Sequence, residues 1–428
     1  MSAEQTDTTR SLEETVGELA RRAREASRRT AELSSRVKDV WLLEAARALE
    51  AERDAVLEAN RRDLERARER GLAEPLQRRL DLAGSRYEQM VAGLREIAAL
   101  PDPVGEIRQM RVRPNGLRVG RMRIPLGVVG IIYESRPNVT VDAAALCVKA
   151  GNAVILRGGS EAIDSNLALA RVLRTAARDA GVPEDAIGIV PTTDRAAVDL
   201  LLRQDRHIDL IIPRGGPELI RKVSRESAIP VLKHDAGVCH IFLDESADSE
   251  MAVALVLDSK IRQMAVCNGL ETLLCHEGAA TRVLPAVLKA LHEAGVEIRG
   301  CARTREIFSE ARPATEEDYA AEFLDRILAV RVVPDLDAAV AHVQRYGSDH
   351  TDVIVTESYQ SAQAWLRRVH SSTVGVNCST AFADGYRLGL GAEIGISTSR
   401  LHAYGPMGLE GLTSEKFVLF GEGQVRED

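Results

Sequence analysis

The N-terminal part of the chain carries apolar residues at helical spacing. Within residues 11–70, Val37, Val40, Trp41 and Ala45 recur at intervals of three and four positions among many Ala, Glu, Arg and Leu residues. That period places apolar side chains on one face of a helix. The pattern therefore predicts amphipathic helices whose charged faces lie in solvent.

After this helical region the period changes to two. Met110 and Val112 alternate with polar residues, and a similar segment follows the Asn115-Gly116 pair. Alternation on both sides of Asn-Gly is typical of a hairpin, because the tight turn needs residues that tolerate a positive φ. We expect a β-ribbon over about residues 106–124.

From residue 126 to 245, apolar strands alternate with helical segments. The expected strands are 126–132, 153–156, 186–190, 208–212 and 238–243. The expected helices are 137–150, 164–180, 195–202 and 217–224. Because the strands are almost continuously apolar, this order predicts one parallel sheet covered by helices on both faces.

A second α/β run covers about residues 260–400. Its strands are expected near Thr272, Ile327, Asp352 and Thr373, and its helices at 281–292, 336–345 and 358–369. The short apolar segment 416–420 is a further strand that needs a partner. The expected fold class is therefore α/β, with two parallel α/β regions and a small β-ribbon.

Composition excludes several classes of protein. The 428 residues are 45% hydrophobic but only 4% aromatic, and the formal net charge is −8. A negative molecule with few rings for base stacking is unsuited to general nucleic acid binding. No apolar stretch is long enough to span a membrane, and the charged N-terminus lacks a signal-peptide core. We expect a cytoplasmic protein with neither nucleic acid nor membrane as a partner.

The six cysteines and nine histidines are scattered along the chain. No two cysteines have CxxC spacing, and six are too few for a disulfide framework in a chain of this length, so we expect reduced thiols. The histidines show no paired spacing of the HExxH kind, so no metal site is expected.

Two glycine turns follow expected strands. In Arg157-Gly158-Gly159-Ser160 the glycines allow close approach to the backbone, and a guanidinium beside a helix start suits a phosphate. An ordinary turn with a surface arginine explains this segment equally well. Arg214-Gly215-Gly216 repeats the arrangement before a proline. Two such turns in one parallel sheet favour an anionic nucleotide at the carboxyl ends of the strands.

Cys267-Asn268-Gly269 marks the junction between the two α/β runs and is a candidate nucleophile, because Lys260 and Arg262 lie nearby in sequence and favour a thiolate. For a lone cysteine, a buried small apolar residue is the commoner interpretation. Cys378 also lies in a polar loop and is the rival candidate. The remaining cysteines suit packing positions: Cys147, Cys239, Cys275 and Cys301.

Seven glycines fall within residues 385–411, which also contain Arg387, Arg400 and His402. Such a segment is expected to be an irregular loop. It either wraps a ligand or connects two parts of the fold.

Several ordered segments together resemble the aldehyde dehydrogenase superfamily. They are 125–139, 149–152, 232–240, 266–272 and 385–411. The resemblance covers nearly the whole chain and extends to members that act on an acyl phosphate. It implies NADPH-dependent reduction of L-glutamyl 5-phosphate to L-glutamate 5-semialdehyde, with release of phosphate from a cysteine thioester, in proline biosynthesis.

The resemblance also implies three structural parts. Residues 1–105 and 125–258 would form the NADP-binding domain, 259–404 the catalytic domain, and 106–124 with 405–428 the oligomerisation segments. The strand at the C-terminal end would then pair with another subunit of a homo-oligomer, a dimer or tetramer. Glutamate 5-kinase, which supplies the acyl phosphate, is a candidate partner.

Roles for individual residues follow from the same resemblance. The nucleophile falls on Cys267 rather than Cys378. The amide that helps bind the oxyanion falls on Asn138, with Ser135 as the alternative. The remaining substrate candidates are Arg136 and Arg262 for the leaving phosphate, Arg387 and Arg400 for the α-carboxylate, and Glu134 or Asp235 for the α-ammonium group.

The chain departs from oxidising members of the superfamily at two places. Where those carry a general-base Glu, it has Leu232-Lys233-His234, which fits a thioester that reacts with phosphate or hydride rather than water. Where NAD-preferring members have a Glu three residues after a Lys, it has Ser160 after Arg157, which favours NADP(H). Glu161 opposes that preference.

Other functions remain open at this point. An oxidising dehydrogenase acting on another aldehyde is the alternative within redox chemistry. A cysteine acyltransferase or hydrolase, or a nucleotide-binding scaffold without turnover, are the alternatives outside it.

Overall fold

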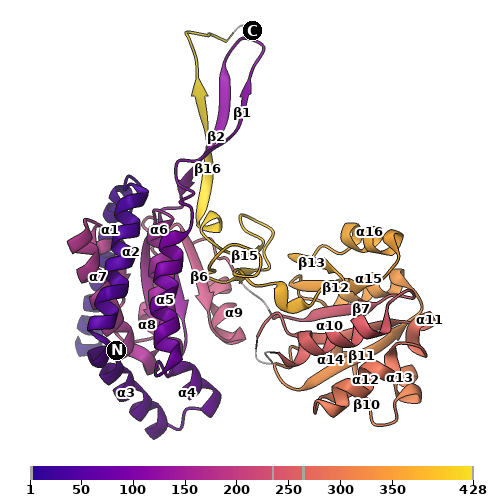
Figure 1. Ribbon diagram of the computed structural model, residues 1–428. Helices are drawn as coiled ribbons and strands as arrows, with labels where there is room; N and C mark the ends of the chain where they lie inside the picture. Colours follow the sequence, from indigo (N-terminus) through magenta and orange to yellow (C-terminus); the bar gives the residue numbers. More distant parts are fainter. Residues whose placement is uncertain (1–2, 234–235, 263–265, 427–428) are drawn as a thin grey trace.

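The computed structural model describes residues 3–233, 236–262 and 266–426. The chain forms two α/β lobes and a long antiparallel sheet that projects away from both (Figure 1). The α/β fold class expected from the sequence is confirmed. Within the described residues, no helix combines the length and the apolar character needed to cross a membrane.

The first lobe contains a parallel sheet in the order β5-β4-β3-β6. Its strands are β3 (Val128–Tyr133), β4 (Ala153–Gly158), β5 (Ile187–Ile189) and β6 (Leu210–Arg214). After β3 the chain adds β4 and β5 on one side, and β6 then returns to the other side of β3. Such a reversal of strand order opens a crevice at the carboxyl ends of the two strands that flank it, here β3 and β6.

Helices pack on this sheet and on one another. Trp41 of α2 is fully buried and donates its indole N–H to the Leu173 carbonyl of α7 at 3.3 Å, which ties the N-terminal helices to the lobe. The helices are α1 (Ala3–Thr30), α2 (Ser35–Ala51), α3 (Arg53–Glu69), α4 (Glu74–Leu80), α5 (Ser85–Ala99), α6 (Asn138–Lys149), α7 (Ile163–Ala180), α8 (Ala196–Leu201) and α9 (Pro217–Glu226).

The second lobe contains a parallel sheet in the order β10-β9-β11-β8-β7-β12-β13. Its strands are β7 (Cys239–Leu243), β8 (Leu270–His276), β9 (Glu297–Gly300), β10 (Arg312–Pro313), β11 (Ile327–Val333), β12 (Thr351–Val355) and β13 (Thr373–Val376). Its helices are α10 (Ser249–Ile261), α11 (Glu277–Ala280), α12 (Leu284–Glu293), α13 (Ala302–Ile307), α14 (Glu316–Tyr319), α15 (Leu336–Tyr346) and α16 (Tyr359–Arg368).

The division between the lobes corrects one expectation from the sequence. We expected the strand at 238–243 to continue the first sheet, with the first domain extending to residue 258. Instead β7 lies between β8 and β12 in the second sheet, and α10 packs on β8. The apolar pattern of β7 identifies a buried strand but not the sheet that receives it, because every side chain of such a strand is buried in either sheet. The chain therefore crosses between Val231, which bridges to Ile211 of β6, and the start of β7.

The projecting sheet corrects a second expectation. The ribbon predicted over 106–124 is present as β1 (Ile107–Val112) and β2 (Arg118–Pro125). The C-terminal strand β16 (Thr413–Phe420) pairs antiparallel from end to end with β2, so the partner that segment 416–420 needs is found within its own chain. Since β1 covers only one edge of β2, the other edge was open to pairing within the chain.

Residues 384–412 form the irregular loop predicted from their glycine content. Only the short strands β14 (Ile396–Ser397) and β15 (Gly405–Pro406) and a 3₁₀ turn at Glu410–Leu412 interrupt it. The Asn152 amide donates to the Leu412 carbonyl at 2.9 Å, so the end of the loop is fastened to the first lobe. The loop thus connects the second lobe to the projecting sheet.

Candidate active site

Cys267 lies in a turn just before β8 and is half-buried. The Gly269 N–H donates to the Val266 carbonyl at 3.1 Å and closes this turn. The Asn268 amide donates to the Ala383 carbonyl at 3.1 Å and fastens the turn to the start of the irregular loop. The candidate nucleophile is thus held at the amino end of β8, an interior strand of the second sheet, next to the start of the irregular loop.

The segment that crosses between the lobes packs directly against this turn. The Cys239 thiol donates to the Cys267 carbonyl at 3.2 Å, and the Gly237 N–H donates to Glu322 Oε1 at 2.9 Å. A Cβ on Gly237 would lie 2.1 Å from the Cys267 carbonyl oxygen, so only glycine fits there. Sequence reasoning did not single out Gly237, although it falls within the 232–240 segment that carries the family resemblance.

The cation beside the Cys267 thiol comes from the first lobe. Burial raises the pKa of Cys267 to about 11, and the Arg214 guanidinium at the end of β6 opposes that rise. The carboxylates of Glu393 and Glu322 raise the pKa further. In the free protein at neutral pH the thiol is therefore mostly protonated.

The cations that the sequence placed beside the thiol are engaged elsewhere. Lys260 is buried and pairs with Glu271 at 2.6 Å. Arg262 is exposed and pairs with Asp258 at 2.6 Å. Nearness in sequence misled here because each of these cations has a carboxylate partner of its own.

Three guanidinium groups from the first lobe influence one another near this thiol. Burial, together with the positive charges of Arg214 and Arg79, lowers the pKa of Arg136 to about 10, and Cys267 acts on Arg136 in the opposite sense. Within the described ranges, none of these three side chains forms an ion pair or a hydrogen bond with a protein group. Like charges gathered without carboxylate partners are the arrangement expected for binding an anion.

A cavity of about 460 Å³ opens beside Arg136. Its walls come from α4, α5, the start of α6 and the irregular loop. Its charged and polar wall residues include Arg79, Arg86, Arg136, Asn138, Asp142 and Glu393. Arg136 and Glu393 line the cavity and also interact electrostatically with Cys267, so the cavity and the thiol share these two charged neighbours.

The two oxyanion candidates are placed differently. Asn138 begins α6 and lines the cavity, where its amide donates to Asp142 Oδ2 at 2.9 Å. Ser135 is buried with a positive φ of 48°, and both its N–H and its hydroxyl donate to Glu161 Oε1, at 2.6 and 2.8 Å. The structure therefore brings Asn138, but not Ser135, to the cavity.

The Arg157–Ser160 and Arg214–Gly216 turns flank the crevice at the end of β3. The buried Arg157 side chain donates to the carbonyls of Gly158 and Asp194, at 3.0 and 3.3 Å. Its Nε is buried without a partner among the described residues. The Gly216 N–H lies 2.9 Å from Glu134 Oε2. A buried guanidinium with an unused donor, next to a glycine turn at a reversal of strand order, fits an anionic nucleotide.

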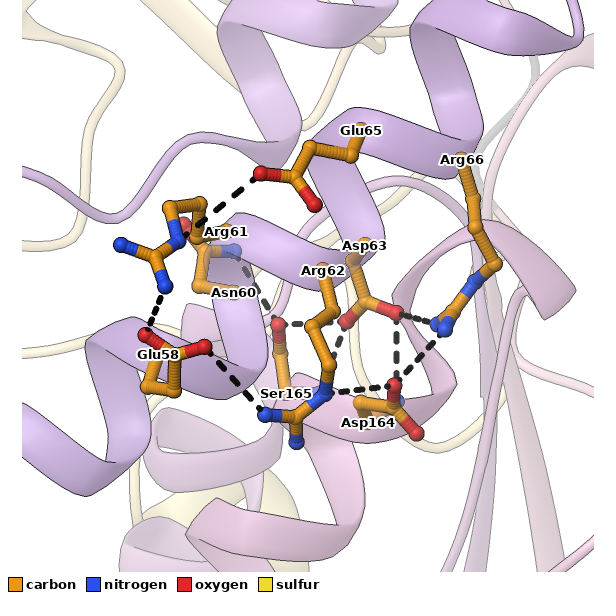
Figure 2. A network of polar contacts seen from close by, with 9 residues as sticks. All are labelled: Glu58, Asn60, Arg61, Arg62, Asp63, Glu65, Arg66, Asp164 and Ser165. Carbon is orange, nitrogen blue, oxygen red and sulfur yellow. Dashed lines mark hydrogen bonds and ion pairs between the residues drawn. The ribbon is translucent and has the colours of Figure 1, made fainter.

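A buried carboxylate supports the helix that follows the first of these turns (Figure 2). Asp63 of α3 is fully buried, and its Oδ2 accepts from the Ser165 N–H at 2.8 Å and the Ser165 hydroxyl at 2.6 Å. Arg66 pairs with Asp63 and lies 2.8 Å from Asp164. The first turn of α7 is thus held by α3, far away in the sequence.

The remaining sequence candidates lie away from the cavity. Arg387 and Arg400 are exposed and are not among its lining residues, and Arg400 lies 3.5 Å from Asp349. Cys378 packs beside Gly375 against the core of the second lobe. Asp235 lies outside the described residues, as does His234 of the segment that replaces the general base.

Comparison with known proteins agrees with this architecture. The family model described as "Aldehyde dehydrogenase family" matches residues 2–299. The gamma-glutamyl phosphate reductase of Moorella thermoacetica is 55% identical over 406 residues, covering 95% of this chain and 97% of that protein. That of Xanthomonas campestris is 53% identical over 412 residues, covering 96% of this chain and the whole of that protein.

Solved structures give the same result. The crystal structure of gamma-glutamyl phosphate reductase from Thermotoga maritima superposes with a TM-score of 0.94 at 44% identity, covering 96% of this chain and 100% of that chain. An acetylating aldehyde dehydrogenase from Geobacillus thermoglucosidasius, with a TM-score of 0.68 at 18% identity, shares the fold. The chain therefore belongs to the aldehyde dehydrogenase family, whose members are oxidoreductases that use a nicotinamide cofactor.

Proposed function

We propose that this enzyme reduces L-glutamyl 5-phosphate to L-glutamate 5-semialdehyde with NADPH and releases phosphate, a step of proline biosynthesis. The names of the full-length relatives support this assignment. The structural observation that carries it is the pair of guanidinium groups of Arg136 and Arg214 that interact with Cys267, neither of which forms an ion pair with a carboxylate among the described residues. An acyl phosphate brings the negative charge that such a group binds, whereas a simple aldehyde brings none.

In the first step, the Cys267 sulfur attacks the acyl carbon of the substrate. The C–S bond forms, the C–O bond to phosphate breaks, and the thiol proton leaves with the phosphate as hydrogen phosphate, so charge and atoms balance. Arg136 receives the leaving phosphate, while Arg214 stabilises the thiolate that attacks. Arg262, the other candidate for phosphate, is exposed and paired with Asp258.

The tetrahedral oxyanion is held by the Cys267 N–H and the Asn138 amide. An oxyanion-hole donor contributes about 3–4 kcal/mol to transition-state stabilisation in comparable acyl-transfer sites. Asp142 accepts a hydrogen bond from Asn138 and so fixes the direction of its amide. When bound, the cofactor would supply the hydride for the thioester carbonyl; the C–S bond then breaks, and the released Cys267 sulfur takes a proton from solvent, which leaves the aldehyde and the thiol.

The Arg157–Ser160 and Arg214–Gly216 turns hold the phosphates of this cofactor. Two observations support a preference for NADP(H). Arg157 keeps a buried Nε donor without a partner among the described residues. The Glu161 carboxylate, which would repel a 2′-phosphate, is bonded to Ser135. Replacing Arg157 by Gln is expected to raise the KM for NADPH more than the KM for NADH.

We also propose that the projecting sheet joins copies of the chain in a homo-oligomer, a dimer or tetramer. Large apolar side chains are exposed on its strands, among them Met110, Val112, Phe417 and Leu419. Sedimentation velocity of a Phe417→Glu/Leu419→Glu variant tests this role, since loss of association is expected if the sheet is the interface.

A phosphate-dependence assay tests the function itself. L-Glutamate 5-semialdehyde should reduce NADP⁺ only when inorganic phosphate is present, and Cys267→Ser should abolish this reaction. Acid formation without phosphate would instead support the oxidising alternative. Retention of full activity by Cys267→Ser would move the nucleophile to Cys378 or to a non-covalent route.

A further inference from the structure

We propose that the 460 Å³ cavity beside Arg136 binds the α-amino-acid end of the substrate, with Arg79 meeting the α-carboxylate and Asp142 meeting the α-ammonium group. This inference rests on the proposed function. It assigns the charges of the substrate that lie away from the reacting acyl group, and it differs from the expectation that Arg387 or Arg400 binds the carboxylate.

The lining of the cavity supports this assignment. Arg136 and Asn138, which the proposed mechanism places at the reacting acyl group, line the same cavity as Arg79 and Asp142. The acyl carbon must lie at the thiol, and the α-carbon is three C–C bonds further along, about 4 Å when extended. A substrate whose acyl group meets Arg136 and Asn138 therefore places its amino-acid end within the cavity, where Arg79 and Asp142 lie.

Most carboxylates of the cavity wall are engaged by the protein backbone. Asp81 Oδ1 accepts from the Ala83 N–H at 2.8 Å. Asp384 Oδ1 accepts from the Tyr386 N–H at 3.0 Å, and Glu393 Oε2 accepts from the Gly385 N–H at 2.9 Å. These groups shape the loops that carry them.

Asp142 differs from these carboxylates. Its Oδ2 accepts from the Asn138 side chain, and among the described residues no donor is recorded for its Oδ1. Burial raises the pKa of Asp142 to about 6, although the Asn138 amide and the Arg214 guanidinium act in the opposite direction, and among the described residues no cation forms an ion pair with it. An ammonium group placed here would compensate its charge while leaving its hydrogen bond to Asn138 intact.

The arginines of the cavity divide in the same way. Arg86 donates to the backbone carbonyl of Arg78 and, at 3.2 Å, to that of Asp81, so it holds the turn after α4. Arg79 makes no such bond among the described residues and faces the cavity. Its neighbour Arg78 is exposed, pairs with Glu74 at 2.5 Å and does not line the cavity, which makes it a matched control.

The test compares three aldehydes in the phosphate-dependent reduction of NADP⁺. They are L-glutamate 5-semialdehyde, 5-oxopentanoate, which lacks the α-ammonium group, and 4-aminobutanal, which lacks the α-carboxylate. The variants are Asp142→Asn, Arg79→Gln and the control Arg78→Gln. Asparagine at position 142 keeps an acceptor for Asn138, so the variant removes the charge without removing the hydrogen bond.

Asp142→Asn should lower kcat/KM for L-glutamate 5-semialdehyde by about 10- to 100-fold, mainly through KM, and leave that for 5-oxopentanoate unchanged. Arg79→Gln should cause a similar loss that disappears with 4-aminobutanal. Arg78→Gln should behave as wild type with all three aldehydes.

Two results would overturn the inference. One is that a cavity variant loses as much kcat/KM with the aldehyde that lacks the group assigned to the replaced residue as it loses with L-glutamate 5-semialdehyde. The other is unchanged kinetics of both cavity variants while Arg387→Gln or Arg400→Gln raises KM. Failure of the wild-type protein to show any phosphate-dependent reaction would instead overturn the proposed function, so the two failures are distinguishable.

Discussion

Replacing Gly237 by alanine should displace the nucleophile without changing any chemical group of the site. The added Cβ would lie 2.1 Å from the carbonyl oxygen of Cys267 and 2.8 Å from both its carbonyl carbon and its Cα. Ordinary contact distances begin near 3.4 Å, and these three neighbours are backbone atoms that cannot rotate away. The turn that carries the thiol must therefore shift by about 1 Å, a displacement that costs roughly 100-fold in rate, or about 2.7 kcal/mol, at a positioned reacting group.

Three quantities are measured: kcat for phosphate-dependent NADP⁺ reduction, the rate of Cys267 alkylation by iodoacetamide, and the thermal midpoint Tm. Gly17→Ala is the matched control, because Gly17 lies inside α1 with nothing within 4 Å of the added Cβ. That control should keep full activity and gain up to about 1 kcal/mol in stability. If Gly237→Ala retains wild-type kcat and alkylation rate, the packing of Gly237 does not position the thiol and the reasoning is refuted.

Three further predictions concern charge and support around the site. Burial places the pKa of Cys267 at about 11. Alkylation of the free enzyme should therefore accelerate about tenfold per pH unit between pH 7 and 10 and level off near pH 11. A plateau in the alkylation rate at neutral pH would contradict this. Arg214→Gln removes the charge that lowers this pKa, so alkylation at pH 9 should be slower than in wild type at the same pH. Asp63→Ala leaves the first turn of α7 without the carboxylate that accepts its hydrogen bonds. The free energy of unfolding, measured by urea titration, should fall by about 2 kcal/mol. Replacing the exposed neighbour Glu65 by Ala is the control and should change it little.

Local sequence pattern predicted the individual elements well because local geometry determines them. The helix period in 11–70, the Asn115-Gly116 hairpin and the glycine-rich loop each depend on neighbouring residues, and the structure contains all three. Pairing over long distances was predicted poorly. β7 joins the second sheet and β16 closes on β2, because an apolar strand is compatible with any open edge and the choice depends on the path of the whole chain.

The same distinction applies to the candidate site. Arg136 and Asn138 were named from the sequence, and both line the cavity. Arg79 and Asp142 gave no signal, because an arginine in a charged helix and an aspartate in an apolar one look like ordinary surface and capping residues. Their significance comes only from the fold, which brings residues of α4 and α6 to the lining of one cavity.

The thiol and the charge that activates it belong to different lobes, and this division has a chemical consequence. Cys267 is anchored to the second lobe through β8, whereas Arg214 and Arg136 extend from the carboxyl ends of strands β6 and β3 in the first. The distance between thiol and guanidinium therefore depends on how the lobes pack and on the position of the turn that carries Cys267, against which Gly237 packs. A substitution that loosens this contact should raise the pKa of the thiol as well as displace it, since the favourable interaction with Arg214 weakens with distance. The pH dependence of alkylation in Gly237→Ala should accordingly lie at higher pH than in wild type, an effect that displacement of an electrostatically isolated thiol would not produce.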